Sequence, residues 1–100
     1  MTIRRYTSKP RTPDTVQAAQ FTGAVIDTDL VKVAQLADEG AELSVVTWPS
    51  GRYLVVRYHG EHGITWTQVD TGDWLVYSER YDNLTDDTTG GLARHYTAGE

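Results

Sequence analysis

The sequence predicts an α+β domain in which an antiparallel β-sheet, a meander of about four to six strands, has one helix packed on one of its faces. Two observations lead to this prediction. One segment in the first half of the chain has the apolar spacing of a helix, and the segments after it are β-branched and separated by short turn sequences. With 100 residues, of which 39% are hydrophobic, the chain is expected to fold as a single domain over residues 1–100.

Residues 15–22 predict the first strand of the body of the domain, because their apolar side chains alternate. Val16 and Ala18 would face one side of a sheet, and Ala19 and Phe21 would face the other. Gly23 then ends the predicted strand.

The helix is predicted over residues 27–39. Its apolar residues recur at the helical period and should pack on the sheet; they are Leu30, Val33, Ala34 and Ala37. Asp27 or Thr28 can accept hydrogen bonds from the first turn, and Gly40 can end the helix in the left-handed conformation. The start and stop signals thus agree with the apolar period.

Four further strands are predicted, over residues 43–48, 52–59, 64–69 and 74–77. Short sequences rich in Gly, Pro and Asp separate them and leave no room for parallel crossovers, so consecutive strands should pair antiparallel. Both faces are apolar along the second of these strands, with Tyr53 and Val55 on one face and Leu54, Val56 and Tyr58 on the other.

The two ends of the chain have different characters. Residues 1–13 are basic and are predicted to form an amino-terminal arm or an edge strand. Their cations could contact phosphates, although an exposed first strand explains them more simply. Residues 82–91 are polar and predict an exposed loop, and residues 92–96 could form a last short strand or a single turn of helix.

The composition excludes several classes of function. The chain has no cysteine, which rules out disulfides, thiolate zinc sites and thiol nucleophiles. No segment approaches the ~18 apolar residues of a membrane span, and residues 1–13 lack the apolar run of a signal peptide. The net charge of −5 makes nucleic acid an unlikely partner. We therefore expect a soluble protein of the cytoplasm with no membrane partner.

Four blocks of the sequence resemble a known group of proteins. They are RYTSKP at residues 5–10, VQAAQFTG at residues 16–23, GDWLV at residues 72–76 and LARHY at residues 92–96. In order and spacing they are similar to small bacteriophage and prophage proteins with a Tyr-Arg-Lys-Lys-Pro-like segment, a Gln-(Phe/Trp)-Thr-Gly strand and a Gly-Asp-Trp strand. Those proteins have no established activity and no catalytic residues to transfer. The resemblance implies a phage-encoded accessory protein that acts in the host cytoplasm.

The sequence contains no recognisable catalytic motif. Its serines lie outside any nucleophile motif, and adjacent carboxylates such as Asp86 and Asp87 are expected to be solvated. His59, Glu61 and His62 form one cluster of metal-type ligands, but a solvated hairpin turn accounts for them better than a zinc site, which needs more converging ligands. We expect a protein that is not an enzyme and holds no cofactor or metal.

Aromatic side chains are the main candidates for a binding surface, because exposed Trp and Tyr mark binding hot spots. Trp74 follows a turn and precedes Leu75, so it is expected in the core. Trp66 shares a face with Ile64, and that face becomes an exposed patch if no helix covers it. The candidate binding residues are Trp48, Tyr53, Tyr58 and Trp66, together with Arg4 and Arg5 of the basic arm.

These features suggest three kinds of function. The leading hypothesis is that the chain binds a host or phage protein through the aromatic sheet face or the sheet edge. One alternative is a small-molecule or nucleotide binder with a pocket between the sheet and residues 82–91. Another is a virion or assembly component that self-associates through an exposed sheet edge. Apolar residues on both faces of one strand also fit a homodimer.

Overall fold

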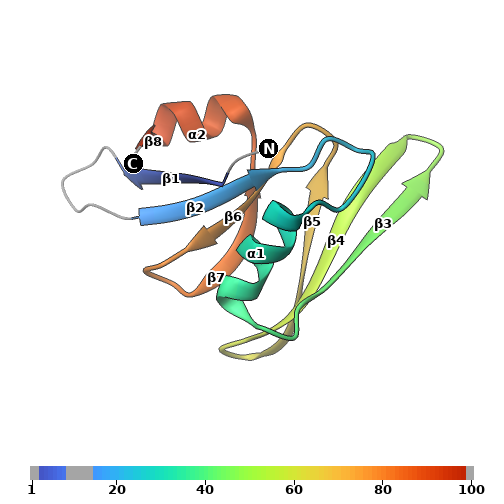
Figure 1. Cartoon of the computed structure of the whole chain (residues 1–100), viewed down its shortest axis with the longest axis horizontal. Helices are drawn as coiled ribbons and strands as arrows, with labels where there is room; N and C mark the ends of the chain where they lie inside the picture. Colours follow the sequence, from blue (N-terminus) through green and yellow to red (C-terminus); the bar gives the residue numbers. More distant parts are fainter. Residues whose placement is uncertain (1–2, 9–14, 99–100) are drawn as a thin grey trace.

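Two antiparallel sheets and two helices make up the part of the chain that the computed structural model describes, residues 3–8 and 15–98 (Figure 1). Within these ranges, side chains are described except at residues 5–8, 95, 97 and 98. The α+β class predicted from the sequence is confirmed. The number of strands exceeds the prediction, since the described residues form eight strands in two sheets.

The larger sheet has five strands in the order β7-β6-β2-β1-β8, and each neighbouring pair is antiparallel. Its strands are β1 (Arg4–Ser8), β2 (Thr15–Gln20), β6 (Trp74–Ser78), β7 (Asn83–Asp87) and β8 (Tyr96–Ala98). The strand predicted over residues 15–22 is confirmed as β2. Residues 1–13 were predicted as a basic amino-terminal arm or an edge strand. An edge strand is wrong for β1, which has a neighbour on each side because the C-terminal β8 pairs with it. The rest of the arm lies outside the described residues.

The smaller sheet is a three-stranded meander of β3 (Glu42–Trp48), β4 (Gly51–Gly60) and β5 (Gly63–Asp70). The predicted meander is correct for these strands and wrong for the fourth, because β6 pairs with β2 and β7 instead of β5. Backbone hydrogen bonds explain the change of sheet. Gly72 N donates to Phe21 O at 2.7 Å and Phe21 N donates to Asp73 O at 2.9 Å, so the turn after β5 is attached to the end of β2.

Helix α1 (Thr28–Ala37) packs against β2, β6 and β4, and so bridges the two sheets (Figure 1). The predicted apolar stripe is confirmed, since Leu30, Val33 and Ala34 are fully buried. They belong to one hydrophobic core that draws on both sheets, with Ala19, Phe21, Leu54, Val56, Tyr58, Val69, Leu75 and Leu84. Burial of this shared apolar surface, at roughly 25 cal/mol per Å², is what holds the two sheets together.

The ends of α1 fit the prediction at the start and depart from it at the finish. Asp27 caps the helix, because its Oδ1 accepts a hydrogen bond from Leu30 N at 2.9 Å. Gly40 was expected to end the helix in the left-handed conformation, and this is wrong. The chain instead leaves the helix through Asp38, which is extended and whose Oδ1 accepts from Gly40 N at 2.9 Å.

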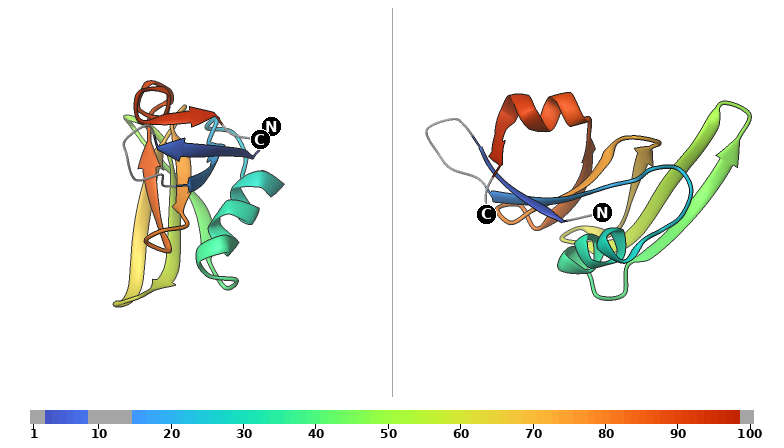
Figure 2. Two further views of the ribbon diagram at one scale, coloured as in Figure 1. Left: turned by 90° about the vertical axis from the view of Figure 1, so that its left-hand side faces the viewer. Right: turned by 45° about the horizontal axis from the view of Figure 1, so that its top comes forward.

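The polar segment over residues 82–91, predicted as an exposed loop, forms β7 and the first half of helix α2 (Thr89–His95). Residues 92–95 are the second half of this helix, and β8 begins at Tyr96. Leu92 is 1% exposed and packs in a second core cluster with Val16, Ala18, Trp74 and Val76. Because these residues alternate with those of the main core, α2 covers the opposite face of the larger sheet from α1 (Figure 2).

The free side of β7 is closed by side chains from the other sheet. The Tyr58 hydroxyl on β4 accepts a hydrogen bond from Leu84 N at 3.1 Å and donates to Leu84 O at 3.3 Å. Thr67 Oγ1 on β5 donates to the same carbonyl at 3.0 Å. Side-chain hydroxyls thus satisfy backbone groups that a further strand would otherwise pair.

Neither helix of the described residues is long and apolar enough to cross a membrane.

Candidate functional site

The three-stranded sheet has one side turned away from the core, here called the outer face. Along β4 the alternate residues Leu54, Val56 and Tyr58 are buried against the core, so the residues between them point the other way. Helix α1 lies on the core side of this sheet (Figure 2). With the strand register, this places on the outer face Glu42, Ser44, Val46 and Trp48 of β3, Tyr53, Val55 and Arg57 of β4, and Ile64, Trp66, Gln68 and Asp70 of β5.

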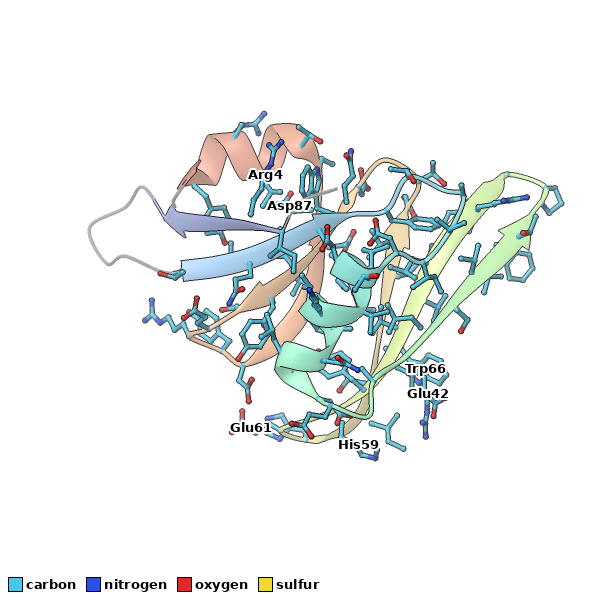
Figure 3. All side chains as sticks on the ribbon, viewed as in Figure 1. Arg4, Glu42, His59, Glu61, Trp66 and Asp87 are labelled. Atoms are coloured by element: carbon cyan, nitrogen blue, oxygen red, sulfur yellow. The ribbon has the colours of Figure 1, made fainter. Side chains whose placement is uncertain are left out.

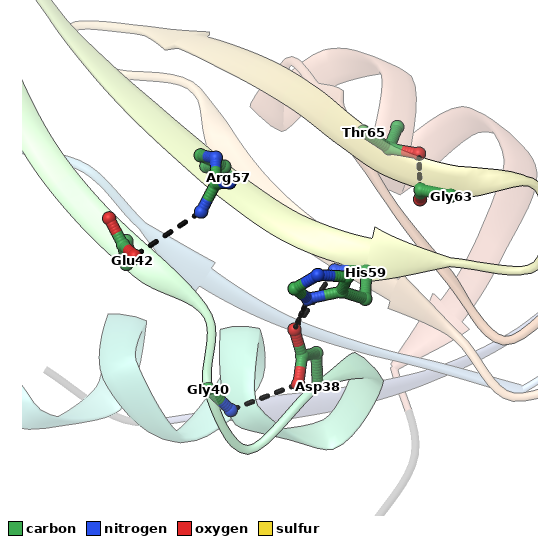
Figure 4. A network of polar contacts seen from close by, with 7 residues as sticks. All are labelled: Asp38, Gly40, Glu42, Arg57, His59, Gly63 and Thr65. Atoms are coloured by element: carbon green, nitrogen blue, oxygen red, sulfur yellow. Dashed lines mark hydrogen bonds and ion pairs between the residues drawn. The ribbon is translucent and has the colours of Figure 1, made fainter.

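Trp66 is the most accessible large apolar residue of the outer face, with 62% of its surface exposed. The register places Glu42, Arg57 and Trp66 side by side across the three strands. Figure 3 shows Glu42 and Trp66 close together on this part of the sheet. The Arg57 guanidinium carbon lies 5.9 Å from the centroid of the Trp66 ring, and its Nη1 donates to Glu42 Oε1 at 3.3 Å (Figure 4). Each contact is worth about 1 kcal/mol or less at an exposed position, yet together they orient the indole without covering it.

A second aromatic group lies at the other end of the outer face. Trp48 is 59% exposed and sits opposite Gly51, which offers it no side chain to pack on. Beside it, the hydroxyls of Tyr53 and Ser50 are hydrogen bonded at 2.7 Å. Trp48 is six residues along β3 from the row of Trp66, so the two indoles are roughly 20 Å apart along the strands.

Apolar side chains connect the two Trp residues. Half-buried Val46 and Val55 lie between them, and Ile64, 52% exposed, extends the surface beyond Trp66. The predicted patch of Trp66 and Ile64 is therefore exposed, because neither helix within residues 3–8 and 15–98 covers this side of the sheet. A partner laid along the strands could contact both indoles.

The structure brings together three of the predicted binding residues, Trp48, Tyr53 and Trp66, on the outer face. Tyr58 was also predicted, and this is wrong, because it is 3% exposed and its side chain points into the core. Arg4 lies on β1 in the larger sheet, where its guanidinium carbon is 5.5 Å from the centroid of the Trp74 ring, away from Trp66 (Figure 3). The side chain of Arg5 lies outside the described residues.

Sequence reasoning missed Arg57, which lies over the Trp66 ring, and Glu42, which pairs with Arg57. The turn at Pro49 and Ser50 contained the information needed to place Glu42 beside Arg57. A two-residue turn pairs Trp48 with Gly51 and so fixes every later pair of the hairpin, including Glu42 with Arg57.

A cleft between the β4–β5 turn and the β6–β7 turn is a second candidate site. It has two adjoining hollows of about 450 and 320 Å³, and both are lined by Gly60, Glu61, Tyr81 and Asp82. Tyr81 is 62% exposed, and the guanidinium carbon of Arg80 lies 5.3 Å from its ring centroid. The cleft thus offers an aromatic ring with one cation and two carboxylates around it.

One wall of this cleft is fixed by Asp82, which adopts a left-handed backbone conformation with φ of 49°. The Tyr77 hydroxyl donates to Asp82 Oδ1 at 2.7 Å. Burial, together with this hydrogen bond, raises the pKa of Tyr77 to about 12, so the phenol stays a donor at any physiological pH.

His59, predicted beside Glu61 and His62, is engaged with Asp38 at the end of α1 (Figure 4). Its backbone N donates to Asp38 Oδ2 at 2.9 Å, and its Nδ1 is 3.2 Å from the same oxygen. Hydrogen bonds from the backbone N–H groups of His59 and Gly40 hold the pKa of Asp38 below its usual value. Among the described residues, no group of three or more His, Asp and Glu side chains is placed to hold a metal ion.

Comparison with known proteins gives no match to any family model, curated protein or solved structure.

Proposed function

We propose that this chain is a non-enzymatic phage accessory protein that acts in the bacterial host by binding a protein through the outer face of its three-stranded sheet. The phage origin rests on the resemblance of the four sequence blocks. The binding role rests on one structural observation. Trp66, Ile64 and Trp48 are each more than half exposed on a single sheet face. Exposed apolar side chains gathered on one face are typical of an interaction site.

The construction of the outer face favours tight binding. Its Trp and Tyr side chains project from paired strands, and Arg57 already orients Trp66 through the contacts described above. Ordering these side chains on binding would therefore cost little conformational entropy. Glu42, Arg57 and Asp70 stand around the apolar strip, which gives the charged border and apolar centre that protein interfaces commonly have.

Photocrosslinking identifies the partner and, in the same experiment, tests whether it binds the outer face. A photoreactive phenylalanine analogue replaces Trp66 in one variant and Tyr81, equally exposed but in the second cleft, in a control variant. Irradiation in host lysate should give a specific adduct from position 66 and none from position 81. Equal adducts from both positions would contradict the proposal.

The purified partner then allows a quantitative test. We expect Trp66→Ser to weaken binding by about 2 kcal/mol, or roughly 30-fold, as for a hot-spot Trp, and Tyr81→Ser to leave it within about twofold. Circular dichroism checks that both variants keep the fold. Unchanged affinity in a folded Trp66→Ser protein refutes a binding role for the outer face.

A small-molecule binder is the second candidate, because the cleft beside Tyr81 and Asp82 has the volume to hold a ligand of modest size. Arg80 could pair with an acidic group of such a ligand, and the Tyr81 ring could stack on it. Native mass spectrometry of the purified protein checks this function. A bound mass that disappears in Tyr81→Ala and persists in Trp66→Ser would favour it over protein binding.

A further inference from the structure

Strand β3 is a free edge of the three-stranded sheet. It pairs with β4 on one side, and within residues 3–8 and 15–98 no strand pairs with its other side. The β3–β4 hairpin extends away from the rest of the fold (Figure 1). Strand β7 differs from β3, because the hydroxyls of Tyr58 and Thr67 form hydrogen bonds with the outward backbone groups of Leu84 on β7.

The usual devices that protect an edge strand are missing from β3. Such strands normally carry Lys, Pro or a bulge, which prevent pairing with another chain. The sequence of β3 is ELSVVTW, with Glu42 at its start as its single charged residue and no Pro. Its register with β4 runs without interruption from the pair of Glu42 and Arg57 to the pair of Trp48 and Gly51, so there is no bulge. Regular backbone groups are therefore presented for further pairing.

We propose that β3 pairs with β3 of a second copy of this chain, antiparallel and about a two-fold axis at Val45, to give a continuous six-stranded sheet. The faces of the sheet select the register. Across the two strands, a residue on the core side must face a residue on the core side, and the same holds for the outer face. Registers that shift one strand by an odd number of residues break this rule and are excluded. An axis at Ser44 or Val46 obeys the rule but pairs fewer residues than an axis at Val45. The register centred on Val45 pairs all seven residues of the strand.

The charges favour a second copy as the occupant of this edge. In the Val45-centred register each Glu42 faces Trp48 of the other copy, and the two Glu42 carboxylates stand roughly 20 Å apart at opposite ends. No like charges are opposed along the strand, whereas they would cost several kcal/mol if they were. Leu43 and Val45, half-buried on the core side of the edge, would gain apolar neighbours from the second copy.

This dimer goes beyond the proposed function, because it uses the edge of the sheet and requires no other protein. It also leaves the outer face accessible, since hydrogen bonds between edge strands lie in the plane of the sheet. A chain that does not dimerise through β3 could therefore still bind a protein through Trp66, and a dimer could form without such binding.

Light scattering with two matched Lys variants tests the edge. Ser44 and Gln68 are both exposed, both on the outer face and in the same row across the sheet, but Ser44 is on β3 and Gln68 is on β5. We expect the 11.2 kDa chain to show a concentration-dependent dimer mass. Ser44→Lys places two cations diagonally across the axis and should weaken the dimer at least about tenfold, whereas Gln68→Lys should not.

A cysteine crosslink tests the register. Because the protein contains no cysteine, Val45→Cys introduces a single thiol, and its Cα would lie within the 4.4–6.8 Å range for a disulfide with its symmetry mate. Val25→Cys is the control, since Val25 is 64% exposed and far more accessible to random collision. Under mild oxidation the variant at position 45 should form covalent dimers much faster than the variant at position 25.

Light scattering and crosslinking together decide whether the chain dimerises through β3. A reversible dimer, weakened by Ser44→Lys alone and crosslinked preferentially at position 45, supports pairing through β3. A protein that stays monomeric at all concentrations overturns the proposal, even if Trp66 still captures a partner. A dimer that Ser44→Lys leaves intact, or that crosslinks equally at both positions, uses another surface and also overturns it.

Discussion

Replacing Tyr58 by Phe tests how the two sheets are joined. The change removes one hydroxyl and keeps the ring that packs in the core. The hydroxyl accepts from Leu84 N at 3.1 Å and donates to Leu84 O at 3.3 Å. In the variant the carbonyl keeps its bond from Thr67, but the amide loses the partner that the structure gives it.

The expected loss of stability follows from this difference between the N–H and the C=O group of Leu84. A buried backbone N–H left without a partner costs about 1–3 kcal/mol, while a lost hydrogen bond whose acceptor keeps another partner costs little. We therefore expect Tyr58→Phe to lower the free energy of unfolding by about 2 kcal/mol. That is a large share of the ~5–15 kcal/mol by which domains are usually stable.

Urea denaturation followed by Trp fluorescence measures this loss as a lower midpoint with an unchanged slope. Tyr53→Phe is the matched control, because it removes a hydroxyl that is bonded to Ser50 at the surface. It should cost less than about 0.5 kcal/mol. Equal losses in the two variants would refute the view that the Tyr58 hydroxyl closes the edge of β7.

Three further changes have defined outcomes. Asp27→Ala removes the cap of α1 and should lower the thermal midpoint by about 4–8 °C, corresponding to about 1 kcal/mol. Asp38→Asn should destabilise at neutral pH. Hydrogen bonds from the backbone N–H groups of His59 and Gly40 lower the pKa of Asp38 in the folded state, so its carboxylate stabilises the fold above its ordinary pKa. The difference in urea midpoint between the variant and the wild type should therefore close as the pH falls through the lowered, folded-state pKa. Gly23→Ala should cost at least about 1 kcal/mol in the same assay, because Gly23 has φ of 94° and a Cβ there would lie 2.7 Å from Thr71 Cγ2.

Local signals in the sequence were sufficient for the elements that depend on local interactions. Helix α1 was predicted because its apolar period and the cap at Asp27 lie in one short segment. The meander of β3, β4 and β5 was predicted because short turns join its strands. The pairing of β6 with β2 was not, since it matches Val16 with Ser78 across most of the chain and depends on hydrogen bonds at Phe21.

Helix α2 was missed for a different reason. Gly90 and Gly91 lie in its first turns, and each costs about 1 kcal/mol relative to Ala in a helix. The helix forms because Leu92 is buried against the larger sheet and Trp74 Nε1 donates to Thr89 Oγ1 at 2.8 Å. Tertiary packing that overrides propensity cannot be read from the segment itself.

The candidate site, too, was predicted correctly only where the local alternation of residues was used. The alternation of residues 64–69 was enough to place Trp66 beside Ile64, and both are exposed because neither of the two described helices covers them. Tyr58 was mistaken for a binding residue because its aromatic type was counted without its face of the strand. The alternation that pointed Tyr53 outward already pointed Tyr58 inward.

The face and the edge of the three-stranded sheet can serve one function together. In the proposed dimer Trp66 and its symmetry mate are five strand spacings apart across the sheet and roughly 20 Å apart along it, a separation of roughly 30 Å on one side of the sheet. Two such sites on one dimer would bind a repetitive or dimeric target in two successive contacts, and the second would occur at a high effective concentration. A modest affinity at each outer face would therefore suffice for stable attachment to an assembled target, while isolated subunits of that target would be released.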